Sequence, residues 1–214
     1  MAAIPSIIIS LFVVLFAITI HEAAHGLAAY KMGDPTAYSM GRVTLNPIAH
    51  IDPFGTIVLP VLMVIMGAPP FGWAKPVPVN PYNLKNPRRD NLIISATGPL
   101  SNLTVALLAF ILIQILKAAN PNMLYGDYTS LLSGLFMILY YFVLINVILA
   151  VFNMIPIPPL DGSGVLMGFL TPEAAQKYER IQPYGFFIVL LLLMTGIISR
   201  ILGFIMGIIN IFIF

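Results

Sequence analysis

Four long apolar runs dominate the order of hydrophobic and polar positions in this chain. They occupy about residues 4–20, 92–116, 130–152 and 184–214. A helix needs roughly 20 predominantly apolar residues to cross the hydrocarbon core of a bilayer. The pattern therefore predicts an all-α polytopic membrane protein with about four to six transmembrane helices.

The first apolar run continues into the sequence HEAAHGLAAY and stops near Gly33, where a glycine, an aspartate and a proline follow one another. These residues end helices and start turns, so we expect one helix over residues 5–32. Residues 36–51 show a mixed, partly alternating pattern. That pattern permits short strands or an irregular excursion.

A shorter apolar stretch at 54–68 follows Pro53 and is interrupted by Pro60. At about 15 residues it is short for a full crossing, so it is predicted to enter the membrane and return. Residues 69–91 are rich in proline, asparagine and basic side chains, which indicates an extended surface loop. We therefore expect residues 33–91 to form a loop region with a re-entrant or short β-like segment.

Three later spans are expected at about 92–117, 130–152 and 184–214. The last run is long enough for one tilted helix, or for a crossing followed by a shorter interfacial or hairpin segment, and Arg200 is the candidate dividing point. Little chain remains outside the apolar runs. Residues 1–214 are therefore predicted to form a single integral-membrane domain.

Composition agrees with this pattern and excludes several classes of function. Hydrophobic residues make up 59% of the chain and charged residues 8%, far from the roughly 25% charged residues of a soluble domain. The absence of cysteine excludes disulfides, cysteine-ligated zinc and a thiol nucleophile. A net charge of +2 is too small to indicate a nucleic-acid partner.

The few basic residues predict an orientation in the membrane. If 54–68 enters and returns, one side carries Lys31, Arg42, Lys75, Lys85, Arg88, Arg89, Lys177 and Arg180. Lys117 then lies on the opposite side. By the positive-inside rule, the side with eight basic residues is cytoplasmic and the N-terminus is extracytoplasmic.

The sequence HEAAH near the end of the first span has the spacing of a zinc site. His21 and His25 are four residues apart, so a helix presents both imidazoles on one face, where they can bind one zinc ion. Glu22 lies roughly 100° around the helix and can contact a zinc-bound water as a base. A pair of core histidines beside an incidental carboxylate is the alternative, but ionisable residues within an apolar span are costly and usually functional.

A catalytic zinc normally has three protein ligands, so a third must lie elsewhere. Lys31 stands where the extended HExxHxxxxxH pattern requires histidine, which leaves His50, Asp52 and Asp161. Asp161 is favoured because it follows a proline-broken stretch, whose irregular backbone is tolerated at membrane depth only inside protein or beside a watery cavity. A helix N-cap explains Asp161 equally well.

Together, HEAAH and the later NMIPIPPLDG resemble the two zinc-binding motifs of the site-2 protease family of intramembrane metalloproteases, peptidase family M50. SATGPLSNL resembles the Gly-Pro-x-x-Asn element of that family. GRVTLNP and GWAKPVPVNP resemble its compact members, which have no PDZ or CBS domain. The similarity runs across most of residues 15–170.

This resemblance implies one zinc ion per chain, held by His21, His25 and Asp161. It implies that Asn153 faces the site, where its amide would hydrogen-bond the developing oxyanion. It also implies a supporting role for Asn102.

The same resemblance gives Gly98 and Pro99 the role of shaping the entry to their span. For Asn102, a purely structural hydrogen bond between helices is at least as good an explanation as a catalytic role. His50 and Asp52 are interpreted as a contact behind the ligands, as part of a gate, or simply as a turn.

The resulting hypothesis is a zinc-dependent endopeptidase that cuts the transmembrane helix of a membrane-protein substrate. Metal-activated water would attack the peptide bond with Glu22 as the general base, near the cytoplasmic side of a bacterial or archaeal cell membrane. Residues 36–51 or 71–80 are candidates to pair with the unwound substrate as an added strand. The alternatives are a membrane metal transporter or sensor, which gives Glu22 no duty, and an inactive scaffold that binds helices.

Overall fold

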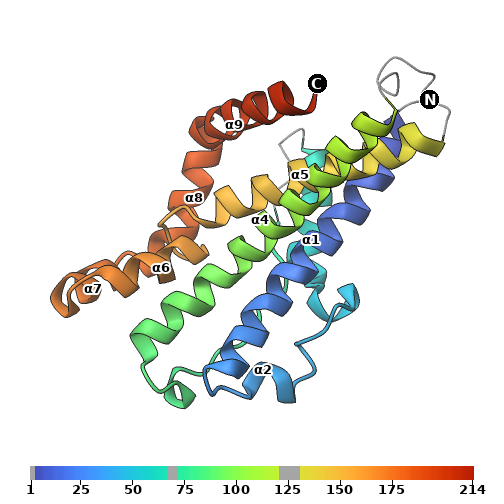
Figure 1. Cartoon of the computed structure of the whole chain (residues 1–214). Coiled ribbons are helices and arrows are strands. Elements are labelled where there is room, and N and C mark those ends of the chain that lie inside the picture. The colour runs from blue at the N-terminus through green and yellow to red at the C-terminus, as the bar shows by residue number, and fades with distance from the viewer. Residues whose placement is uncertain (1–2, 67–71, 121–130) are drawn as a thin grey trace.

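The structure is a computed structural model that describes residues 3–66, 72–120 and 131–214. Its centre is a bundle of three long helices: α1 (Ala3–Lys31), α4 (Pro87–Ala119) and α5 (Leu131–Asn153). They lie side by side, with α4 running opposite to the other two (Figure 1). Of the described helices, these three are each long and apolar enough to cross a membrane. The prediction of an all-α polytopic membrane protein is confirmed.

Helix α4 begins five residues before the apolar span that was predicted from residue 92. Pro87 takes the first helical position, where its missing N–H costs nothing. The Asp90 carboxylate accepts a hydrogen bond from the backbone N–H of Asn86 at 2.9 Å. Local capping thus extends the helix through the basic pair Arg88 and Arg89, which a search for apolar residues does not include.

Short helical turns occupy the region between α1 and α4. They are α2 (Thr36–Ser39), η1 (Pro47–His50), the π-helical η2 (Pro53–Val58), α3 (Leu59–Ile65) and η3 (Pro81–Asn83). The described part of this region contains no strand. Of the two alternatives for residues 36–51, the structure takes the irregular excursion.

The described part of the predicted re-entrant segment turns back on itself. Lys75 donates a backbone hydrogen bond to the His50 carbonyl at 3.0 Å, and Trp73 donates one to the Gly55 carbonyl at 3.2 Å. The chain therefore returns beside the point where η2 begins, although residues 67–71 lie outside the described part. We call the extended residues 72–80 that follow the strap.

Beyond α5 the chain forms α6 (Asp161–Phe169), α7 (Pro172–Glu179), η5 (Gln182–Tyr184), α8 (Gly185–Met194) and α9 (Ile197–Ile213). The apolar run 184–214 is divided at Gly196, where the helix axis bends by 63°, and α8 with α9 forms at most one further span. Gly196 has a φ of +72°, a conformation that favours glycine. Arg200, the predicted dividing point, instead donates its N–H to the Gly196 carbonyl as α9 begins.

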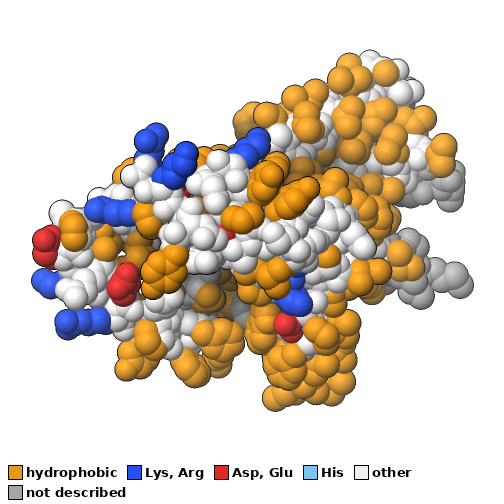
Figure 2. Space-filling view, turned by 90° about the horizontal axis from the view of Figure 1, so that it is seen from below, with side chains coloured by type: hydrophobic (Ala, Val, Ile, Leu, Met, Phe, Trp, Pro, Cys, Tyr) orange, Lys and Arg blue, Asp and Glu red, His pale blue; other side chains and the backbone are white. Residues whose placement is uncertain are grey.

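The two ends of the bundle differ in charge. Lys31 ends α1 and Arg88 lies in the first turn of α4 at the same end, whereas Lys117 lies in the last turn of α4 at the other end. Figure 2 shows most of the visible Lys and Arg side chains toward the end that carries α7, while hydrophobic side chains cover most of the opposite end. Which end faces the cytoplasm stays a prediction.

Candidate active site

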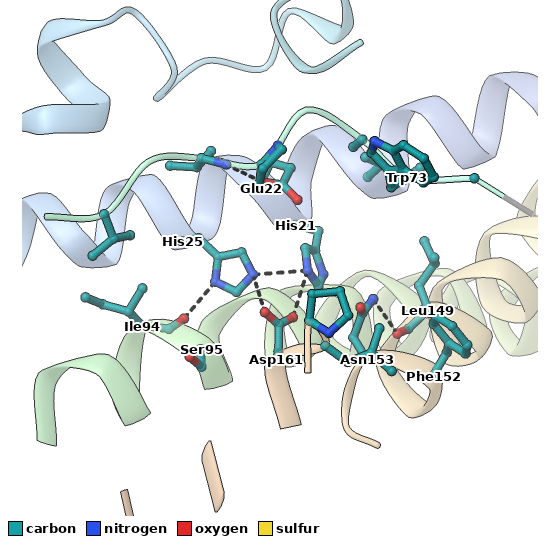
Figure 3. Close-up of a pocket in the computed structure, with 18 of the residues that line it drawn as sticks. His21, Glu22, His25, Trp73, Ile94, Ser95, Leu149, Phe152, Asn153 and Asp161 are labelled. Atoms are coloured by element: carbon teal, nitrogen blue, oxygen red, sulfur yellow. Dashed lines mark hydrogen bonds and ion pairs between the residues drawn. The ribbon is translucent and has the colours of Figure 1, made fainter. Parts of the chain in front are cut away.

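The two histidines of HEAAH face the first residue of α6. His21 and His25 are both buried on the inner side of α1, and Figure 3 shows their imidazoles pointing toward Asp161. The His21 Nε2 lies 3.0 Å from Asp161 Oδ2, and the His25 Nε2 lies 3.2 Å from Asp161 Oδ1. The two Nε2 atoms are 3.1 Å apart. The two neighbouring histidines of α1 thus meet an aspartate that lies far from them in the sequence.

The hydrogen bonds of the Nδ1 atoms determine which nitrogen of each imidazole carries the hydrogen. The His25 Nδ1 lies 2.7 Å from the carbonyl oxygen of Ile94, and the His21 Nδ1 lies 2.6 Å from the Oδ1 of Asn102. Both partners are acceptors, so each Nδ1 carries the hydrogen and donates it. In a neutral imidazole the Nε2 is then left with a bare lone pair.

The donor set fits a zinc ion. Two bare nitrogens and a carboxylate converge, and the buried Oδ2 of Asp161 receives no hydrogen bond in the described structure. Three acceptors at this distance repel one another unless a cation lies among them. Imidazole nitrogens and a carboxylate oxygen are ligands that catalytic zinc takes in proteins.

Glycine is required where α4 passes behind the histidines. A Cβ atom added to Gly98 would collide with the imidazoles of both His21 and His25. Helix α4 can approach α1 this closely only without a side chain at that position. Gly98 therefore forms a wall of the site itself, which extends its predicted role at the entry to the span.

The alternatives for the third ligand are placed elsewhere or differently. Asp161 is the first residue of α6, but the N-cap is Leu160 and no side chain caps the helix. His50 contacts the carbonyl of Thr44, and Asp52 accepts backbone hydrogen bonds at the start of η2. Within the described residues, one group of metal-ligating side chains is close enough to hold an ion: His21, His25 and Asp161.

Glu22 lies beside this group and is not part of it. Its Oε2 accepts a hydrogen bond from the backbone N–H of Val77, in the strap, at 2.9 Å. Figure 3 shows the carboxylate between the strap and the histidines. It is thus held by backbone from outside the helix bundle.

A cavity of about 580 Å³ opens beside these side chains. Its lining is mainly apolar and includes Trp73 and Phe186, whose rings meet edge to face at 6.1 Å. Asn153 also lines it and donates one amide hydrogen to the Leu149 carbonyl at 3.0 Å. An amide has two hydrogens, so Asn153 keeps a second for another partner.

Asn146 of α5, which the sequence motifs do not include, lies behind Asn102, the partner of His21. Asn102 donates to the Oδ1 of Asn146 at 2.8 Å, and both amides are fully buried. An isolated asparagine in the apolar run of α5 was the available signal, since polar groups within spans are costly. Its partner could not be read from the sequence.

Comparisons with known proteins agree with the family resemblance. The model of peptidase family M50 matches residues 114–196. The following three relatives are each named "putative zinc metalloprotease". YwhC of Bacillus subtilis is 39% identical over 92% of this chain and 84% of its own length. Rip2 of Mycolicibacterium smegmatis is 30% identical over 87% of this chain and 66% of its own length. MJ0611 of Methanocaldococcus jannaschii is 33% identical over 74% of this chain and 69% of its own length. No solved structure matches the chain.

Proposed function

Since the chain belongs to peptidase family M50, we propose that it is an intramembrane zinc endopeptidase, with one zinc ion held by His21, His25 and Asp161. The observation that carries the proposal is the meeting of three bare acceptor atoms beside a fourth, non-ligating carboxylate, Glu22. A metal-storage or transport site needs the three acceptors and gives Glu22 no task. Hydrolysis needs both.

The substrate we propose is a transmembrane segment of another membrane protein. His25 lies six residues before the end of α1, which places it about 9 Å inside the helix end. The long helices around the site are apolar enough to lie in lipid. A peptide bond reaches this depth if it belongs to a membrane-embedded segment, and that segment must unwind locally to expose its carbonyl.

Each side chain then has a defined task. When bound, zinc supplies Lewis acidity to the scissile carbonyl and to the attacking water. Glu22 takes a proton from that water and passes it to the leaving nitrogen. Asn153 offers its second amide hydrogen to the developing oxyanion. The mainly apolar lining of the cavity confines bound water to the neighbourhood of the polar side chains.

The substitution Glu22→Gln tests the proposal in purified protein reconstituted with a membrane-embedded substrate. Glutamine keeps the size of the side chain but cannot take the proton, so cleavage should fall by roughly 10²–10⁴-fold while one zinc per chain remains. Glu179→Gln, at the exposed end of α7, is the matched control and should leave both unchanged.

The outcomes separate the possible functions. Wild-type cleavage by Glu22→Gln would refute the catalytic assignment. If the wild-type protein binds zinc but cleaves none of the membrane substrates tested, a metal sensor or transporter is favoured. Absence of both zinc and cleavage would leave a scaffold.

The orientation is a further part of the proposal: the active site lies toward the cytoplasmic end of the bundle. Cysteines introduced singly at Lys85 and Lys117 should then label from opposite faces of sealed vesicles, with Lys85→Cys accessible from the cytoplasmic side. Labelling of Lys85→Cys only from the extracytoplasmic side would reverse the orientation.

A further inference from the structure

His21 is joined to two other helices by a short series of buried amides. Asn102 of α4 lies between His21 of α1 and Asn146 of α5. Its side-chain nitrogen also donates to the Ala17 carbonyl of α1 at 3.1 Å. Asn146 in turn donates to the Phe142 carbonyl one turn earlier in α5, at 2.8 Å.

The directions of these hydrogen bonds are fixed by two backbone carbonyls, which can only accept. Because the Phe142 carbonyl accepts, the NH₂ group of Asn146 must face it, and the Asn146 Oδ1 must face Asn102. The nitrogen of Asn102 then donates both hydrogens, one to Asn146 and one to Ala17. Its Oδ1 is left facing His21.

The consequence reaches the candidate metal ligand. An oxygen 2.6 Å from the His21 Nδ1 can only accept, so the hydrogen of the neutral imidazole is held on Nδ1. The Nε2 is thereby kept as a bare lone pair directed at Asp161. Asn102 and Asn146 are both 0% exposed, so water cannot replace either partner.

We propose that Asn146 is a positioning residue for the metal centre, acting through Asn102 to keep His21 in the tautomer that binds zinc. This inference rests on the proposed function, because it takes His21 to be a ligand. It adds a contribution from α5 that neither zinc-binding motif contains. Partners behind a metal-bound histidine typically change metal affinity by roughly 10–100-fold.

The test measures zinc affinity of the whole protein in detergent by competition with a chelator of known affinity. Asn102→Leu should weaken zinc binding by roughly 10–100-fold. Asn146→Leu should weaken it less, by about 3–10-fold, because Ala17 still orients Asn102. The double variant should bind as Asn102→Leu does, since Asn146 acts only through Asn102.

Two further variants separate positioning from packing. Asn146→Asp loses the hydrogen bond to Phe142 but keeps a side-chain acceptor for Asn102, so it should lower zinc affinity less than Asn146→Leu does. Asn210→Leu is the matched control. It removes a half-buried amide of α9 that accepts a hydrogen bond from the Tyr140 hydroxyl of α5, away from the site. It should lower thermal stability without changing zinc affinity.

The visible absorption spectrum of the cobalt-loaded protein gives a second reading. It should change in Asn146→Leu and stay unchanged in Asn210→Leu, since only the first disturbs a ligand. Unchanged zinc affinity and spectrum in Asn146→Leu, or effects that add to those of Asn102→Leu, would overturn the inference. If His21→Ala itself kept full affinity, the proposed function would fail instead.

Discussion

His21 and Glu22 are neighbours in the sequence, yet two different kinds of structure hold them. His21 is fixed by buried side-chain amides at a junction of three long helices. Glu22 accepts a hydrogen bond from the backbone of the strap, an extended segment without helical hydrogen bonds. The proposed ligand side of the site is thus built into the bundle, whereas the proposed base is positioned by a segment outside the bundle.

The strap is itself fastened by two buried charged residues outside the spans. Asp34 accepts the backbone N–H of Asn80 at 2.7 Å, and Arg42 donates to the Lys75 carbonyl at 2.6 Å. Both side chains come from the turn region after α1. Substitutions on the ligand side should therefore lower zinc affinity. Substitutions on the strap side should lower the turnover rate and leave zinc affinity unchanged.

The largest effect is expected for Asp161→Ala. Removing a proposed ligand should lower zinc affinity by more than the roughly 10–100-fold typical of a group behind the ligands, and cleavage should be lost. Metal content after dialysis and cleavage of a reconstituted substrate measure both. Asp52→Ala, which removes the cap of η2, is the control. Full zinc occupancy in Asp161→Ala would move the third ligand to Asp52 or His50.

The next effect in size is expected for Gly98→Ala. The added methyl group collides with both imidazoles, so zinc affinity and cleavage should fall together, by roughly 10–100-fold. Gly203→Ala, in α9, adds the same group where no atom lies within 4 Å and should change neither. If Gly98→Ala lost cleavage but kept normal zinc affinity, the assignment of zinc affinity to the ligand side and turnover to the strap side would be wrong.

A smaller effect is expected for Asp34→Asn, which weakens the fastening of the strap. Glu22 should then be misplaced for part of the time, and kcat should fall by about tenfold, less than the roughly 10²–10⁴-fold of a lost general base. Zinc affinity should stay unchanged. Equal losses of zinc affinity and kcat would show that the strap also supports the ligands. Glu179→Gln serves again as the control.

The smallest effect concerns pH. Burial opposes the ionisation of Asp34, but hydrogen bonds from Asn83, Thr36 and the Asn80 backbone hold its pKa below the ordinary value of 3.8. Its contribution to strap stability is therefore full above about pH 3.8 and is lost as the pH falls through the lowered pKa.

The single tryptophan, Trp73, lies in the strap, so its fluorescence measures this change. In chelator-treated protein the emission should stay constant down to about pH 3.8 and shift only below it. In Asp34→Asn it should be shifted already at neutral pH. An identical acid transition in both proteins would assign the change to another group.

The long helices and the candidate ligand residues could be identified from the sequence because their signals are local. Apolar runs of membrane length identify α1, α4 and α5, and the four-residue spacing places His21 and His25 on one helical face. The resemblance then pointed to Asp161, which the structure places against both imidazoles. Neither step needed information on how the helices pack.

The remaining parts depend on contacts between distant segments. The partner of Asn146 is set by how α4 and α5 pack, which the apolar pattern of α5 does not encode. Glu22 is held by a backbone N–H, and every non-proline residue has one, so Val77 gave no signal. At the break near the C-terminus, charge suggested Arg200, whereas backbone conformation decided for Gly196.

Pro99 lies inside α4 and has no N–H to donate to the carbonyl of Ser95, four residues before it. Ser95 lines the cavity beside the candidate zinc ligands. The proline thus leaves the Ser95 carbonyl without its usual helical donor, in a residue that lines the cavity. A buried carbonyl without its helical donor needs another partner, for which ordered water is common, so we expect this turn of α4 to bind a water molecule beside the proposed zinc site.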